Sequence, residues 1–353
     1  MGDFIDQAWA LYEQKAYVDL NNLCYTAQEA GDEGFEVLFA AGLAACRLGD
    51  PVNGARFIKR ACGLDPRSDL YTYLAPVLKR MGCKAMVEFW ESQFREYRRF
   101  KTMENFVVSY PKCGRTWIRL VLGKYALGAD DGDPLELTDI TRARAEFPAT
   151  DIIHDDYPHW KPGADICTDK SLYADKRVAF LVRDPRDTLV SYFFQYTRRG
   201  DKDRAGDGGF SGDHSDFIRH AIGGLECLVG FYNVWAANSH VPKDFKLFRY
   251  EDFRADPTGA YADLIAFLDF PDLGSATLAD AVGFGDFDNM KALEQKDTYD
   301  SNRLKPPSDG DPEGFKVRRG KVGGYTDYLN ADDLAYIDSY LNDHLDDVYA
   351  AYK

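Results

Sequence analysis

The pattern of apolar and polar positions changes near Lys101 and divides the chain into two parts. Before this point, apolar and small residues recur at helical spacing, which predicts a helical segment. After it, short apolar runs alternate with longer helical patterns, and this alternation predicts a parallel sheet whose strands are connected through helices. We therefore predict an N-terminal all-α domain over residues 1–100. We predict an α/β domain over residues 101–353, with a central, mostly parallel sheet flanked by helices.

The N-terminal helical pattern repeats with a period of 34 residues. Gly42 and Gly49 lie seven residues apart, Ala61 follows twelve residues later, and Asp65-Pro66 ends the unit. This spacing resembles the tetratricopeptide repeat, a helix-turn-helix unit whose small residues let paired helices approach closely. A third, degenerate unit is predicted from residue 68 to about residue 100. The repeats either bind a protein partner or only support the second domain, and the sequence leaves both interpretations open.

Four apolar runs in the second part are predicted strands. They cover residues 106–109, 151–154, 177–182 and 245–250. Four polar side chains lie at or just after the ends of these runs, namely Lys112, His154, Arg183 and Tyr250. Ligands of parallel α/β sheets bind outside the carboxyl ends of the strands. We therefore expect these side chains to face one crevice.

A tight loop follows the first predicted strand, and a helix is expected to begin near Arg115. The free N–H groups of a first helical turn and the positive end of the helix dipole favour anions. Gly114 lets the backbone come close to a ligand, and Thr116 offers a hydroxyl. Lys112 and Arg115 add positive charge, so a phosphate or sulfate group is the best-suited ligand. An ordinary turn with a solvated lysine is the alternative. The loop is not a Walker A loop, because its lysine precedes its only glycine.

The third predicted strand leads into a helix with clear start signals. Asp184 is a suitable N-cap, and Pro185 suits the first helical position. Arg183 then points into the crevice, and Ser191, two turns into the helix, could face it. In the alternative interpretation, Arg183 forms a structural ion pair with Asp184 or Asp187, and Ser191 lies on the helix surface.

Two long stretches rich in Gly, Asp, Ser and Pro, residues 201–213 and 296–314, are predicted loops of the kind that form lids. Near the C-terminus, Asn330 is expected to cap a last helix. The apolar stripe of that helix is interpreted as core, and it consists of Leu334, Ile337, Leu341, Leu345 and Val348.

Composition narrows the classes of function. A chain of 353 residues with 45% hydrophobic content can build two cores. It contains no apolar run of membrane-spanning length, and its N-terminus lacks the features of a signal peptide, so we expect a cytoplasmic protein. The seven cysteines are scattered, odd in number and without C-x-x-C spacing. We expect reduced thiols, with neither a disulfide framework nor a zinc site, and no metal is implied.

The net charge of −15 disfavours binding to nucleic acid and to anionic membranes. Against this acidic background, the run K-V-R-R-G-K at residues 316–321 is locally basic. Such a run could bind a small anionic ligand.

Four motifs, in this order, resemble those of the sulfotransferases that use 3′-phosphoadenosine 5′-phosphosulfate (PAPS). They are Y-P-K-C-G-R-T-W from residue 110, R-D-P-R-D-T-L-V-S from 183, R-Y-E-D-F from 249 and R-R-G-K-V-G-G-Y from 318. The resemblance covers about residues 104–350 and does not extend to the helical repeats. It implies transfer of a sulfuryl group from PAPS to a hydroxyl or amine, leaving adenosine 3′,5′-bisphosphate (PAP).

The resemblance also implies roles for individual residues. The 5′-phosphosulfate would bind to Lys112 and to the backbone of Cys113, Gly114, Arg115 and Thr116. The 3′-phosphate would bind to Arg183, Ser191, Arg318, Arg319 and Gly320. The adenine would lie near Trp117 and Tyr250 and stack on Phe287. Two basic clusters suit a ligand with two separated anionic groups, and the guanidinium fork suits a terminal phosphate.

The chain departs from the family pattern at three places. Cys113 stands where Ser is usual, and Arg115 stands where Thr is usual. The catalytic histidine usually follows Lys-Thr, whereas His154 follows two isoleucines. His154 is the predicted base, because a neutral imidazole can accept a proton near neutral pH. Lys112 would stabilise charge on the leaving oxygens, and His159 is the competing candidate for the base.

Two other functions stay open at this point. A nucleotide kinase with an atypical phosphate loop would need magnesium. A non-catalytic scaffold, in which the repeats bind a partner and the second domain is a relic, predicts a degraded site. A sulfotransferase would act on a small-molecule or glycan acceptor that bears a hydroxyl, and the repeats could hold a protein partner.

Overall fold

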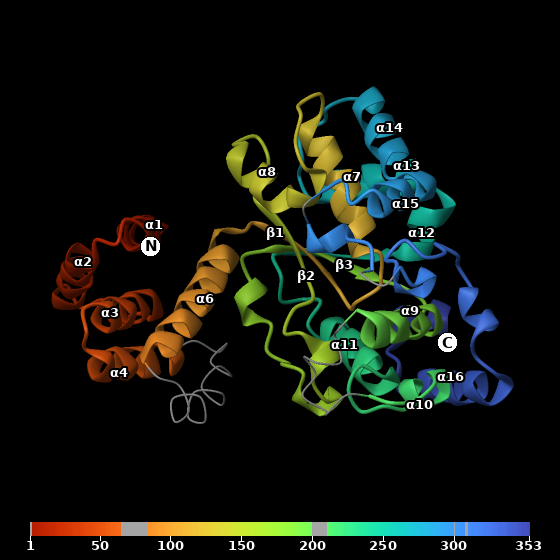
Figure 1. The fold of residues 1–353 in the computed structure, drawn as a ribbon, viewed down its shortest axis with the longest axis horizontal. Helices are drawn as coiled ribbons and strands as arrows, with labels where there is room; N and C mark the ends of the chain where they lie inside the picture. The colour runs from red at the N-terminus through yellow and green to blue at the C-terminus, as the bar shows by residue number, and fades with distance from the viewer. Residues whose placement is uncertain (1, 65–82, 200–209, 300, 308–309) are drawn as a thin grey trace. The chain divides into compact units, whose positions relative to one another are not determined.

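The computed structural model describes residues 2–64, 83–199, 210–299, 301–307 and 310–353. The chain forms two compact units, Met1–Thr102 and Met103–Lys353 (Figure 1). Parts of the predicted third repeat and of the two predicted loops lie outside the described residues, at positions 65–82, 201–209, 300 and 308–309.

The N-terminal unit is helical. Its described helices are α1 (Gly2–Glu13), α2 (Tyr17–Glu29), α3 (Phe35–Arg47), α4 (Pro51–Cys62) and α6 (Cys83–Thr102). The first residues of α1 and α3, and those of α2 and α4, lie about one predicted repeat length apart. Phe39 of α3 packs against Trp90 and Phe94 of α6, and all three side chains are buried in a core of their own.

Small residues let α3 and α4 approach closely. A Cβ atom added at Gly42 would lie 2.5 Å from Cγ1 of Ile58 and 2.9 Å from the carbonyl oxygen of Gly54. One added at Gly54 would lie 2.3 Å from Sγ of Cys46. These contacts agree with the role predicted for small residues in the helix pairs. The assignment to the tetratricopeptide class stays a prediction.

The second unit is built on a sheet that has four parallel strands in the described residues, in the order β2-β1-β3-β4. The strands are β1 (Asn105–Ser109), β2 (Thr150–Ile153), β3 (Arg177–Val182) and β4 (Asp244–Arg249). All of β1 is buried, as expected for a central strand with both faces covered. The α/β fold with a parallel sheet is therefore confirmed, and each predicted strand is correct to within one residue.

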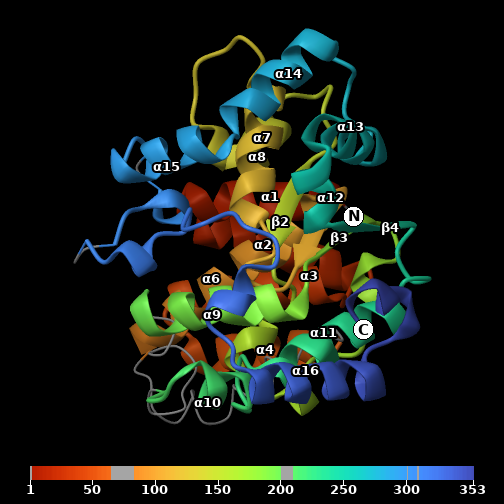
Figure 2. The same ribbon diagram turned by 90° about the vertical axis from the view of Figure 1, so that its right-hand side faces the viewer.

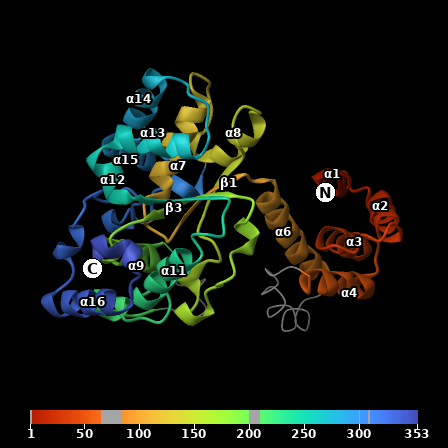
Figure 3. The ribbon, with the colours of Figure 1, turned by 180° about the vertical axis from the view of Figure 1, so that it is seen from behind.

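Helices cover both faces of this sheet. Figures 1, 2 and 3 show α7, α8 and α13 to α15 on one side and α9, α10, α11 and α16 on the other. The α-helices are α7 (Arg115–Leu127), α8 (Leu137–Ala143), α9 (Pro185–Arg198), α10 (His214–Ile218), α11 (Leu225–Ala237), α12 (Tyr250–Ala255), α13 (Pro257–Phe267), α14 (Ser275–Phe284), α15 (Phe287–Gln295) and α16 (Ala331–His344). Short 3₁₀ helices are η1 (Pro134–Glu136), η2 (Pro158–Trp160), η3 (Gly163–Asp165), η4 (Ser171–Tyr173), η6 (Asn302–Leu304), η7 (Pro312–Gly314), η8 (Gly324–Asp327) and η9 (Asp347–Tyr352).

The predicted apolar stripe near the C-terminus is correct within α16 and wrong at its last residue, Val348. Asn330 caps the helix as predicted, by accepting a hydrogen bond from the N–H of Asp333 at 2.9 Å. Ile337 and Leu341 are buried. The helix stops at His344, however, and the chain continues as η9, so helical spacing no longer applies. Val348 is 52% exposed, and the neighbouring Tyr349 is buried in its place.

Cys24, Cys46, Cys62, Cys113, Cys167 and Cys227 are free thiols. Among the helices that the structure describes, none combines the length and the apolar character needed to cross a membrane.

Candidate active site

The loop between β1 and α7 is the strand-loop-helix turn that the sequence predicts. Lys112 and Gly114 both adopt left-handed backbone conformations, with φ of 70° and 101°. A Cβ atom at Gly114 would lie 2.7 Å from the ring of Tyr250, so the glycine allows this close approach as well as the turn. Gly114 is the N-cap of α7 and has no side chain to occupy the first N–H groups of the helix. These groups are therefore suited to an anion.

A cavity of about 220 Å³ opens at the carboxyl ends of the strands. It brings together all the residues predicted to act in catalysis or donor binding except Cys113: Lys112, Gly114, Arg115, Thr116, Trp117, His154, Arg183, Ser191, Tyr250, Phe287, Arg318, Arg319 and Gly320. His159, the competing base, lines the same cavity.

Cys113 lies in the loop, but its thiol is buried outside the cavity lining. Its sulfur lies 3.5 Å from the hydroxyl of Tyr232. Burial raises the pKa of the thiol to about 11, so it is protonated at neutral pH. Only the backbone of Cys113 is therefore suited to the binding role predicted for it.

Arg183 combines the two arrangements that the sequence leaves open. It lines the cavity, and its guanidinium also lies 3.4 Å from the carboxylate of Asp187. The same guanidinium donates hydrogen bonds to the carbonyl oxygens of Lys112 and Lys321, both at 3.2 Å, and lies over the ring of Tyr250. Arg183 therefore joins the loop after β1 to the basic run near the C-terminus.

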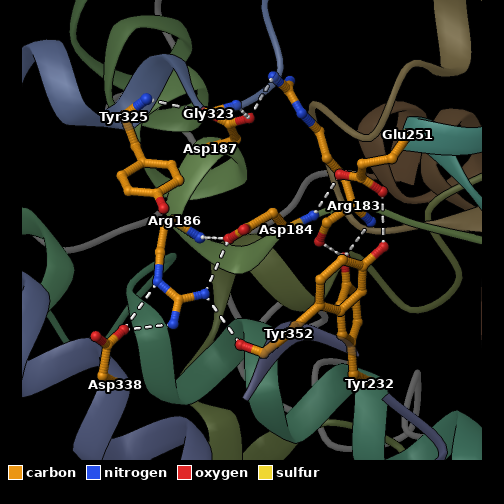
Figure 4. Close-up of polar contacts among 10 residues, drawn as sticks. All are labelled: Arg183, Asp184, Arg186, Asp187, Tyr232, Glu251, Gly323, Tyr325, Asp338 and Tyr352. Atoms are coloured by element: carbon orange, nitrogen blue, oxygen red, sulfur yellow. Dashed lines mark hydrogen bonds and ion pairs between the residues drawn. The ribbon is translucent and has the colours of Figure 1, made fainter. Parts of the chain in front are cut away.

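The start of α9 is fixed by a polar network (Figure 4). Buried Asp187 accepts hydrogen bonds from the N–H groups of Gly323 at 2.9 Å and Tyr325 at 3.0 Å. Glu251 accepts from the N–H of Asp184 at 3.0 Å and from the hydroxyl of Tyr352 at 2.8 Å. The network ties α9 to segments far along the chain. This role of Asp187 was not predicted, because the sequence indicates it only as a possible ion-pair partner of Arg183.

Glu294 holds the backbone of the basic run at residues 316–321 in place. It is a buried carboxylate that was not predicted from the sequence. Glu294 accepts hydrogen bonds from the N–H groups of Lys316 and Val317, both at 2.8 Å. Two side chains of the run have acidic partners. Arg318 donates to Glu313 at 2.9 Å, and Arg319 donates to Asp327 at 2.7 Å. An anion that binds these arginines therefore competes with carboxylates.

Aromatic rings form another wall of the cavity. Trp117 and Tyr250 lie edge to face with ring centroids 5.8 Å apart. Gly320 keeps the backbone close to Phe287, since an added Cβ would lie 2.7 Å from that ring. Gly285, which was not predicted from the sequence, also lines the cavity, and a Cβ added there would lie 2.2 Å from Cγ2 of Val121 and 3.2 Å from Nε1 of Trp117. Such rings suit a flat, conjugated group.

His154 directly follows β2 and lies at its carboxyl end. Its Nδ1 is 2.9 Å from the carbonyl oxygen of Ser109. A carbonyl only accepts, so Nδ1 carries the hydrogen and Nε2 of the neutral ring is a free acceptor. Burial, followed by the charge of Arg115 and by His159, holds the pKa of His154 well below its ordinary value. The ring is therefore neutral and able to take a proton.

Two lysines in the cavity have lowered pKa values. Burial, together with the charge of Arg199, lowers the pKa of Lys112 to about 8 and that of Lys316 to about 7. An anion bound between them would stabilise their charged forms.

The lining is strongly cationic. As far as the structure describes it, it contains one carboxylate, that of Asp187. It contains eight basic side chains, namely Lys112, Arg115, Arg183, Arg254, Lys316, Arg318, Arg319 and Lys321. In a chain with a net charge of −15, this local reversal indicates a ligand with several negative charges. Within the described ranges, no group of three or more His, Cys, Asp or Glu side chains could hold a metal ion.

Comparisons with known proteins agree with this geometry. The model of the sulfotransferase domain matches residues 103–349. Cytosolic sulfotransferase 17 of Arabidopsis thaliana is 23% identical over 275 residues, which cover 69% of this chain and 75% of the relative. A crystal structure of mouse sulfotransferase SULT7A1 complexed with PAP is 19% identical and covers 69% of this chain and 84% of its own, with a TM-score of 0.48. Because the domain match spans well over half of the sequence and contains the whole cavity, the chain belongs to the sulfotransferase family.

Proposed function

We propose that this protein transfers a sulfuryl group from PAPS to a hydroxyl or amine of an acceptor, with His154 as the base. The observation that carries the proposal is the cavity, in which cationic side chains and aromatic rings meet at the carboxyl ends of the strands. PAPS has two separated anionic groups and a purine, and the lining fits each of them.

The residues predicted for the donor divide into three groups in this cavity. Lys112 and the backbone of the following loop would hold the 5′-phosphosulfate. Arg183, Ser191 and the run from Arg318 to Gly320 would hold the 3′-phosphate. The rings of Trp117, Tyr250 and Phe287 would surround the adenine.

Catalysis would depend mainly on positioning and charge stabilisation, as in phosphoryl transfer. When bound, PAPS supplies a sulfuryl group on a phosphate leaving group, so a bond from sulfur to the acceptor oxygen or nitrogen forms as the S–O bond to the phosphate breaks. Nε2 of His154 would take the proton of the acceptor hydroxyl, because Nδ1 already donates to Ser109. The ammonium of Lys112 would stabilise the negative charge that develops on the leaving oxygen.

The complete lining disfavours a relic scaffold, and the family match favours sulfuryl transfer over a kinase reaction. We infer a small-molecule or glycan acceptor. We also propose that the N-terminal helices form tetratricopeptide-like pairs that can present a protein partner. The Arabidopsis relative is named a cytosolic enzyme, which supports a cytoplasmic location for this protein.

Titration with PAP in the absence of magnesium tests the donor assignment. We expect tight, saturable binding by calorimetry and transfer from PAPS to a simple phenolic acceptor under the same conditions. Adenosine 5′-phosphate, which lacks the 3′-phosphate, is the matched control ligand and should bind more weakly. Binding of ATP with magnesium in preference to PAP would instead support the kinase function.

Replacing Arg318 with alanine should weaken PAP binding by about 1.5 to 3 kcal/mol, the usual range for a hydrogen bond to a charged group. The preference for PAP over adenosine 5′-phosphate should fall with it. Glu313→Gln is the matched variant, because it removes the carboxylate that Arg318 contacts in the structure. It should leave PAP affinity equal or higher. An unchanged preference in Arg318→Ala would exclude Arg318 as the contact to the 3′-phosphate.

A further inference from the structure

Arg115 is a cation that the donor assignment does not use. It is the first residue of α7, and the family resemblance gives only its backbone a role in holding the phosphosulfate. Its side chain lines the cavity. The guanidinium makes no hydrogen bond or ion pair with any residue that the structure describes. A partly buried cation is costly unless it is paired, so this side chain is suited to an anionic ligand.

The residues that influence Arg115 most strongly come from β2 and from the loop that follows it. The charges that act most strongly on it come from Asp151 of β2 and from Tyr157 in the loop after that strand. After burial, Arg115 is the largest influence on the pKa of His154. The residues proposed for the nucleotide, such as Arg183 and Tyr250, follow β3 and β4 on the other side of β1. Arg115 therefore lies by the base, where the acceptor must bind.

Two carboxylates whose charges act on this part of the cavity already accept hydrogen bonds from other groups. Asp151 is buried and accepts hydrogen bonds from the hydroxyl of Thr138 at 2.9 Å and from the N–H of Ile152 at 2.7 Å. Glu294 is occupied by the backbone of Lys316 and Val317. Neither carboxylate forms an ion pair with Arg115, and Glu294 instead lies 3.5 Å from the guanidinium of Arg199.

Lys316 is a second basic side chain to consider in this cavity. It lines the cavity, and its ammonium donates to the carbonyl oxygen of Arg303 at 2.7 Å. The charge of Arg115 is among those that lower its pKa, after those of Arg199 and Lys112. Both side chains line the same cavity, and a guanidinium and an ammonium can together hold one oxyanion by charge-assisted hydrogen bonds.

We propose that Arg115, together with Lys316 of the same cavity, binds an anionic group of the acceptor, a carboxylate or a sulfate, and so sets the acceptor specificity of the enzyme. This inference rests on the proposed function and defines its acceptor as a hydroxy compound that carries a negative charge. The guanidinium fork can bind either oxyanion through two parallel hydrogen bonds.

Matched acceptor pairs test the proposal on the full-length enzyme. 4-Hydroxyphenylacetate and 3-hydroxyphenylacetate are compared with their neutral amides, and hydroquinone monosulfate is compared with hydroquinone. The wild type should favour at least one anionic member by about 10-fold to 100-fold in kcat/KM, the range of a charge-assisted contact. Arg115→Thr, which restores the family's usual residue, should remove most of this preference. The preference is the ratio of kcat/KM for the two members of one pair, so an effect of the change on donor binding or on His154 cancels from it. Arg115→Lys keeps the charge and should retain part of the preference.

Further measurements separate this inference from the proposed function. PAP binding and turnover of the neutral acceptors report on sulfuryl transfer, whatever the anion preference is. Where an acceptor is not turned over, its affinity for the enzyme–PAP complex is measured instead, and equal affinities within every pair would overturn the proposal. Two results for Arg115→Thr would together assign Arg115 to the donor instead. The value of kcat/KM would fall by the same factor for both members of a pair, and the affinity for PAPS would fall more than the affinity for PAP.

Discussion

Replacing His154 with alanine is expected to lower kcat by about 10²-fold to 10⁴-fold, the usual contribution of a positioned base, while PAP affinity stays nearly unchanged. The structure gives the chemical reason. The bond to Ser109 fixes the tautomer in which Nε2 is free to accept a proton. The side chain is neutral, so its loss should cost the anionic donor little binding energy.

His159→Ala is the matched variant, because the two imidazole rings lie 4.9 Å apart and line the same cavity. His159 is only 3% exposed, and its backbone carbonyl accepts a hydrogen bond from Tyr192. We therefore expect a mainly structural role and a smaller loss of kcat. Turnover of a phenolic acceptor and calorimetric titration with PAP are measured for both variants. If His159→Ala is inactive and His154→Ala is active, the base is His159.

The pH dependence provides a second measurement on the same residue. Burial and the nearby cation favour the neutral ring, which is the form that can accept a proton. Because the pKa lies below its ordinary value, His154 should stay neutral as the pH falls from 8 to its ordinary pKa of 6.5. Protonation of His154 should therefore lower kcat/KM only at pH values below 6.5. A decrease that begins above that value would show that another group titrates.

The sequence predicts those parts of the site that depend on local signals. The four strands are short, apolar runs bounded by polar residues, and a strand buried on both faces needs such a run. The start of α9 follows from Asp184 and Pro185, and Asp184 does accept a hydrogen bond from the N–H of Arg186 at 2.8 Å. Parallel strands end at one edge, so side chains that follow them converge without further information.

The sequence does not predict partners that are distant along the chain. Asp187 and Gly323 meet across 136 residues, and Glu294 binds the backbone 22 and 23 residues later. Their residue types are common, and no spacing rule connects them. The Val348 error has a different cause. The apolar spacing continues past His344, but the helix ends there and the 3₁₀ helix η9 follows at Asp347.

The pairing of Arg318 and Arg319 with carboxylates was also outside the reach of sequence reasoning. A basic run in an acidic chain predicts an anion site, but it does not show which acidic residues lie against the run. Glu313 and Asp327 flank the run closely in sequence, and each is bound to one of its arginines. If these arginines bind the donor as proposed, the donor competes with Glu313 and Asp327 for them, which lowers the net affinity that each arginine can contribute.

Replacing Lys112 with methionine is expected to lower kcat by about 10²-fold to 10³-fold, the usual cost of losing a donor to developing negative charge. PAP affinity should fall as well, by about 1.5 to 3 kcal/mol. Lys112 is a suitable point for both effects, because it lines the cavity and its ammonium makes no hydrogen bond or ion pair with any described residue. Methionine keeps the length and apolar stem of the side chain, so the loss reports on the charge.

The pH dependence of PAP binding distinguishes this role from a structural one. The pKa of Lys112 is about 8, because burial and the charges of Arg199, Arg318 and Arg183 outweigh that of Glu294. An anionic ligand favours the protonated lysine and raises this pKa, so affinity should be greatest below the pKa of the free protein and fall as the pH rises through 8. Calorimetry between pH 7 and pH 9, in buffers of different ionisation enthalpy, should detect proton uptake on binding. In Lys112→Met the decrease should be smaller. Lys112→Arg keeps the charge but changes its shape, so it should recover PAP affinity better than kcat. A methionine variant with the wild-type pH dependence would exclude Lys112 from contact with the donor.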